Sequence, residues 1–119
     1  VFNAWQATSA VQRSKVARSQ SEIALQETKN QLRQAVETAY NDAIAAEKTY
    51  SSATRQVAAR EEAYRMAKQR YDLNAINFVE YQVSENDFFQ AQSDLLRAKY
   101  DFIFKMKVLD FYQGKPLGF

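Results

Sequence analysis

Small and apolar residues recur in strict steps of four and three through the middle of the chain. A repeat that averages 3.5 residues over five heptads is typical of a coiled-coil seam and not of an isolated globular helix. Only Arg60 departs from the residue type of this row. The pattern predicts a long helix with a partner along one side, and the row consists of Leu32, Val36, Ala39, Ala43, Ala46, Tyr50, Ala53, Val57, Arg60, Tyr64, Ala67 and Tyr71.

A second, shorter row of small and apolar residues, Ala59, Ala63, Met66 and Leu73, runs beside the first. Two rows imply neighbours on two sides of the helix, as in a bundle or an α-barrel. The apolar residues before Leu32 are spaced irregularly, but nothing there breaks a helix. We therefore predict one helix from about residue 4 to 73, about 105 Å long at a rise of 1.5 Å per residue.

The helical pattern is interrupted once, by a turn predicted at residues 74–77. Asn74 can adopt the left-handed conformation that ends a helix. Asn77 followed three residues later by Glu80 is an asparagine version of the capping box that begins one. A stop and a start within about four residues predict two antiparallel helices.

The returning helix is expected from about residue 78 to 112, because Gly114 and Pro116 end it and leave a tail at 113–119. It carries two apolar columns that repeat every seven residues. One column is Phe88, Leu95, Phe102 and Leu109, and the other is Phe89, Leu96 and Ile103. This helix ends opposite about residue 37, so residues 1–36 have no partner within the chain and need one from elsewhere.

Charged residues favour the same hairpin. With the turn centred near residue 75, several residues of opposite charge face one another, although Glu62 and Asp87 face with like signs. Exposed pairs of this kind contribute about 0.5 kcal/mol each, so they set register more than stability. The expected pairs are Arg70/Glu80, Arg65/Glu85, Arg55/Asp94, Lys48/Asp101 and Asp42/Lys107.

Composition excludes most chemistry. The 119 residues include no cysteine and no histidine, so thiolate nucleophiles and the usual general base are missing. A net charge of +2 gives no electrostatic case for nucleic acid. The acids Glu80, Glu85 and Asp87 are more simply a solvated face than a metal site. We expect no enzyme activity, no catalytic residue, no cofactor and no metal, in a chain that begins at Val1 as a fragment of a larger protein.

The turn is the one candidate site, because the apolar residues Leu73, Ile76 and Phe78 cluster there and the tip has little core in which to bury them. An apolar tip on a long hairpin is a natural docking point. The alternative interpretation, that these side chains only close the hairpin, fits the residues equally well.

At the turn and in the helix that follows, the chain resembles the TolC-like outer-membrane efflux proteins. The family has Tyr-x-x-Gly at its periplasmic tip and an Asp six residues after the Gly; Tyr71, Asn74 and Glu80 stand at these places. The segment 92–102 is similar to members from Bacteroidetes-type bacteria. The family's downstream positions are matched without gaps by Phe88, Ala91, Leu95, Ala98, Tyr100 and Leu109.

The resemblance implies an all-α, antiparallel coiled-coil hairpin that forms part of a trimeric periplasmic α-barrel. The full-length protein would be a homotrimer that touches the membrane only through a β-barrel outside this segment. It would act as a passive exit duct, coupled through a periplasmic adaptor (a membrane fusion protein) to an inner-membrane transporter. The alternatives are a scaffold hairpin without a transport role and the hairpin of an adaptor, which is normally flanked by lipoyl-like β segments.

The resemblance also implies roles for the residues around the turn. Glu80 and Val83 would line the channel constriction, although Val83, like Ile76, stands where some members carry a charged residue. The adaptor-docking tip would consist of Tyr71, Leu73, Asn74, Ala75, Ile76, Asn77 and Phe78.

Overall fold

The structure, a computed structural model, describes residues 1–118 and contains the helices α1 (Phe2–Asp72) and α2 (Phe78–Tyr112). No strand occurs among the described residues, which confirms the predicted all-helical class. The sequence predicted helices at about 4–73 and 78–112. The last residue of the predicted tail, Phe119, lies outside the described residues.

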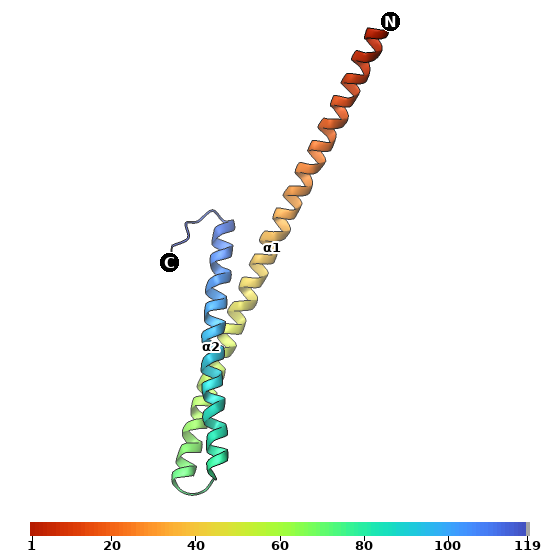
Figure 1. The fold of residues 1–119 in the computed structure, drawn as a ribbon. Coiled ribbons are helices and arrows are strands. Elements are labelled where there is room, and N and C mark those ends of the chain that lie inside the picture. The colour runs from red at the N-terminus through yellow and green to blue at the C-terminus, as the bar shows by residue number, and fades with distance from the viewer. Residues whose placement is uncertain (119) are drawn as a thin grey trace. The chain divides into compact units, whose positions relative to one another are not determined.

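The chain divides into two units, Val1–Thr38 and Ala39–Phe119. The first unit is a single helical segment of α1, in which only Ser9, Ala35 and Val36 are even half-buried. The second unit is an antiparallel hairpin, in which the rest of α1 and the whole of α2 lie side by side (Figure 1). Neither helix contains, among the described residues, an apolar stretch of the length that crosses a membrane.

The hairpin has a thin core made of alanine. The four buried residues of α1 all belong to the row of small and apolar residues predicted from the sequence. Alanine at the contact lets two helix backbones approach closely, but each buried methyl contributes only about 0.8 kcal/mol. The core therefore orients the helices more than it stabilises them; its members are Ala39, Ala43, Ala46, Ala67, Ala91 and Ala98.

The two apolar columns of α2 have different surroundings. Phe88, Leu95, Phe102 and Leu109 are half-buried and follow the seam with α1, and Tyr50 of α1 stacks on Phe102 at 6.0 Å between ring centroids. We call these four residues the inward column. The outward column, Phe89, Leu96 and Ile103, is exposed. The hairpin thus uses one of the two apolar columns that the sequence provides.

None of the five expected cross-helix ion pairs occurs within residues 1–118, and several of their members pair locally instead. Arg65 pairs with Glu62 three residues earlier, and Lys105 pairs with Asp101 at 3.1 Å. Within residues 1–118 one ion pair joins the two helices, between Arg60 Nη1 and Asp87 Oδ2 at 2.8 Å. The expected pairing of Arg65 with Glu85 was wrong because a neighbour one turn away on the same helix is easier to reach.

Candidate functional site at the hairpin tip

α1 ends in a Schellman motif built on Asn74. The Asn74 backbone adopts φ 54°, in the left-handed region that asparagine tolerates better than most residues. The Ala75 N–H donates to the Arg70 carbonyl at 2.7 Å, and the Asn74 N–H donates to the Tyr71 carbonyl at 2.9 Å. These bonds satisfy carbonyls that would be unpaired at the helix end, and they reverse the chain direction within a few residues.

Asn77 begins α2. Its side-chain Oδ1 accepts a hydrogen bond from the backbone N–H of Glu80 at 2.8 Å, as expected for an N-cap. A full capping box would also have the Asn77 N–H donate to the Glu80 carboxylate, and that second bond does not occur among the described residues. The exposed Glu80 side chain lies in the first turn of α2, where the positive end of the helix dipole favours a carboxylate.

Aromatic rings from both helices stack directly behind the turn. Tyr71 stacks on Tyr81 with ring centroids 5.0 Å apart, and Phe78 lies 6.0 Å from Tyr71. One heptad further from the turn, Tyr64 stacks on Phe88 at 5.6 Å. We call these five residues the tip aromatic cluster. Their contacts cross between the helices and hold the base of the turn.

A short chain of hydrogen bonds runs through this cluster. The hydroxyl oxygens of Tyr64 and Tyr81 lie 3.2 Å apart, and the Tyr64 hydroxyl donates to Glu85 Oε1 at 3.5 Å. Each hydroxyl hydrogen is used once if Tyr81 donates to Tyr64. The hydrogen bond to Tyr64 raises the pKa of Tyr81 to about 12, and partial burial and the charge of Glu85 act in the same direction.

This hydrogen-bonded aromatic network was not predicted from the sequence. Its signal was present in the sequence, because Tyr64 and Tyr71 are seven residues apart on one helix and Tyr81 and Phe88 are seven apart on the other. On facing seams this spacing places aromatic rings opposite one another.

The residues assigned to the docking tip all lie in or beside this one turn. Leu73 is 79% exposed and Phe78 is 52% exposed, although both are large and apolar. Ile76 is half-buried and shares a shallow depression with Met66 and Ala67 of α1. The turn therefore presents two apolar side chains, while Asn74, Ala75 and Asn77 shape its backbone.

The two residues assigned to the constriction occupy the first two turns of α2. Glu80 and Val83 are both exposed, and Glu80 also borders the depression that contains Ile76. No group of three or more histidine, cysteine or acidic side chains arranged to hold a metal occurs in the part of the chain that the structure describes.

Comparisons with protein-family models, with curated proteins and with solved structures found no match to this chain.

Proposed function

We propose that this chain is a periplasmic segment of an outer-membrane efflux duct of the TolC-like type. In this proposal the full-length protein is a homotrimer, and its helices form the wall of a passive exit channel. The turn between α1 and α2 meets a periplasmic adaptor, which connects the channel to an inner-membrane transporter.

The observation that carries the proposal is the outward column of α2. Phe89, Leu96 and Ile103 are exposed in the hairpin but spaced like a second coiled-coil seam. A helix with an apolar column on each side is what the wall of an α-barrel requires.

The unit Val1–Thr38 has the same two-sided character. The apolar spacing here is irregular, but Val11, Leu25 and Leu32 fall in one column that Arg18 interrupts, and Val16 and Ile23 fall in another. The columns are offset by two residues, which is about 200° around a helix, so they face opposite sides. All five side chains are exposed, which supports neighbours on both sides of this segment in the assembled protein.

The tip supports the adaptor contact. Leu73 and Phe78 are exposed at a turn whose backbone is fixed by two asparagine motifs, so a partner meets a preformed apolar surface. A rigid turn with exposed apolar side chains binds at a lower entropic cost than a flexible loop.

The test is drug export by cells that carry the parent protein with Leu73 and Phe78 both changed to Ser. Because both side chains are exposed, we expect normal assembly but at least a tenfold loss of export and of adaptor cross-linking. Tyr40→Ser is the matched control, since Tyr40 is an exposed aromatic residue of α1 away from the turn. Unchanged export in the double variant would refute the docking tip and favour a scaffold hairpin.

A second test concerns the constriction. If Glu80 lines the narrowest part of the trimeric channel, its three carboxylates favour cations. Glu80→Gln should then reduce the cation selectivity of the purified trimer in a planar bilayer, while Glu61→Gln, at an exposed acid of α1, should leave it unchanged. Equal selectivity in the wild type and Glu80→Gln would remove Glu80 from the constriction.

A further inference from the structure

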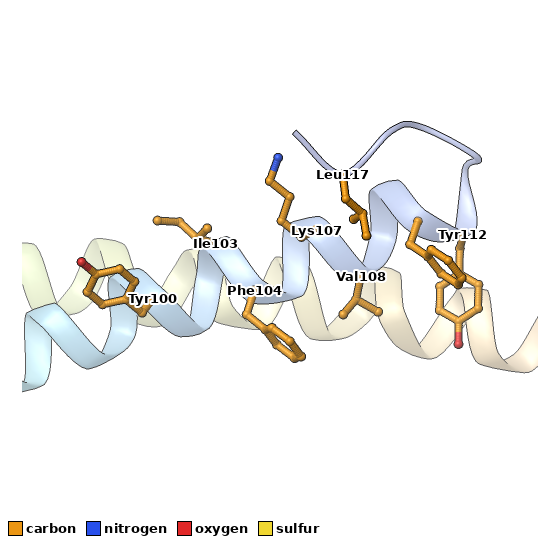
Figure 2. A pocket seen from close by; sticks show the side chains of 8 residues that line it. Tyr100, Ile103, Phe104, Lys107, Val108, Tyr112 and Leu117 are labelled. Atoms are coloured by element: carbon orange, nitrogen blue, oxygen red, sulfur yellow. The ribbon is translucent and has the colours of Figure 1, made fainter. Parts of the chain in front are cut away.

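An apolar groove of about 530 Å³ lies at the end of α2, away from the turn. Its floor is one face of the last four turns of α2, which includes Ile103, Phe104 and Phe111. Leu117 of the C-terminal tail closes one side, and Figure 2 shows Leu117 and Lys107 on the same side of the helix. The volume is within the range of about 300 to 1,000 Å³ that is typical of small-molecule sites.

The tail returns over the helix because α2 ends in its own Schellman motif. Gly114 adopts φ 73°, and the Lys115 N–H donates to the Asp110 carbonyl at 3.0 Å. Pro116 follows and cannot continue a helix. The tail thereby places one aliphatic side chain, Leu117, against the groove.

Of the described residues that line the groove, Lys107 alone is charged. Its Nζ donates a hydrogen bond to the Gly118 carbonyl oxygen. The nearby acids are engaged elsewhere, because Asp110 pairs with Lys115 at 3.5 Å and Asp101 pairs with Lys105. Within residues 1–118, neither of these acids pairs with Lys107, so the ammonium can receive an anion.

The lining of the groove and the hydrogen bond of Lys107 indicate the chemistry that the groove accepts. Apolar and aromatic side chains, Leu117 among them, form most of the lining, and Lys107 donates to an oxygen acceptor, the Gly118 carbonyl. A long-chain carboxylate combines both features in one molecule, and its charged oxygens bind a lysine more strongly than a neutral carbonyl does. We propose that this groove binds a free long-chain fatty acid, with the carboxylate on Lys107 and the acyl chain along Phe104 and Phe111.

The groove shares Ile103 with the outward column, so the inference concerns the hairpin unit without neighbouring helices and is tested on the isolated chain. The experiment is isothermal titration of the 119-residue chain with laurate below its critical micelle concentration. Dodecanol, which has the same chain length and no charge, is the matched ligand. We expect saturable binding of laurate and binding of dodecanol that is about tenfold weaker, the effect of losing one charge-assisted hydrogen bond.

Two variants locate the site. Lys107→Gln should weaken laurate binding about tenfold without weakening dodecanol binding, whereas Lys99→Gln, at an exposed lysine of the same helix outside the groove, should change neither. Amide chemical-shift changes should concentrate between residues 100 and 117. Equal affinity for laurate and dodecanol, or shift changes spread over the exposed apolar residues of 1–38, would overturn the proposal. So would binding to phosphatidylglycerol vesicles alone, without binding of monomeric laurate.

Discussion

The two ends of the hairpin are closed by different means. Near the turn, the seam contains Tyr64, Tyr71, Tyr81 and Phe88, and their rings and hydroxyls interact across the helices. Away from the turn, α1 contributes alanine to the seam, with Ala39, Ala43 and Ala46 all buried. Both ends keep the same heptad spacing, so residue size and not periodicity distinguishes them.

This difference shows where the hairpin completes itself and where it does not. At the tip end the large side chains are turned between the helices, where they fix the pairing. At the alanine end Phe102 and Leu109 are half-buried in the seam, but other large side chains of α2, such as Leu96 and Phe104, are exposed. The rings behind the turn pair within the hairpin, whereas the outward side chains of the alanine end have no partner among the described residues.

The largest expected effect comes from overfilling the alanine end. Ala46 is 3% exposed, so Ala46→Leu should force the helices apart and lower the free energy of unfolding by about 1 to 3 kcal/mol. Ala45→Leu, one residue earlier and exposed, should change it by less than about 0.5 kcal/mol. Urea unfolding followed by circular dichroism at 222 nm measures both. Equal effects at the two positions would mean that the seam is misplaced.

A smaller effect is expected at the turn. Asn74→Ala keeps a Cβ at φ 54° but loses the polar side chain that helps asparagine adopt this conformation, so it should lower the free energy of unfolding by about 1 kcal/mol. Asn74→Gly removes the Cβ, so it should be neutral or stabilising. Gly114→Ala has the same backbone strain at φ 73° but releases only the tail, so it should leave the urea midpoint of the hairpin nearly unchanged. A large midpoint shift in Gly114→Ala would show that the tail stabilises the whole hairpin.

The tyrosine pair should appear in the pH dependence of stability. The pKa of Tyr81 is about 12 in the folded chain against 10.0 ordinarily, so the folded state holds this proton more tightly. The stabilisation that comes from this tighter proton binding is complete below pH 10, and it is lost as the pH rises from 10 to 12. Tyr64→Phe should flatten that part of the stability profile, with a decrease at pH 7 that is smaller than that of Asn74→Ala. An unchanged alkaline profile would contradict the hydroxyl pair.

The smallest effect is expected for the ion pair between the helices. Arg60 and Asp87 are about half exposed, so Arg60→Gln should cost no more than about 0.5 kcal/mol. The difference between wild type and variant should disappear in 1 M NaCl, because salt screens exposed pairs. A loss that persists at high salt would show that Arg60 contributes through packing of its aliphatic stem.

The helices were predictable because their signals are local and repeated. The row from Val36 to Tyr71 supplied the seam, and Asn74 and Asn77 supplied a stop and a start that each depend on one backbone conformation or one side-chain bond. Residues at equal sequence distances from the turn near residue 75 were expected to face one another, and this rule predicted an approximate register. The tilted ring pair of Tyr71 and Phe78 and the stacked pair of Tyr50 and Phe102 fit this register well.

The polar contacts were not predictable in the same way. This rule predicts which turns of the two helices lie at the same height, but it does not predict the direction in which a side chain points around its helix. Arg65 therefore bonds to Glu62, and Asp87 binds Arg60. The tyrosine hydroxyl pair requires the two oxygens to lie within hydrogen-bonding distance, here 3.2 Å, and a seven-residue repeat does not specify positions so closely.

Cross-linking at neighbouring positions tests most directly whether the outward column is an assembly surface. The chain has no cysteine, so Leu96→Cys in the outward column and Leu95→Cys in the inward column can be introduced singly into the parent protein. Leu96 is exposed and Leu95 is half-buried in the hairpin seam. We predict that a bifunctional maleimide links two protomers of Leu96→Cys into a covalent dimer and leaves Leu95→Cys monomeric in isolated outer membranes. Monomers from both variants, or equal cross-linking of both, would contradict the account.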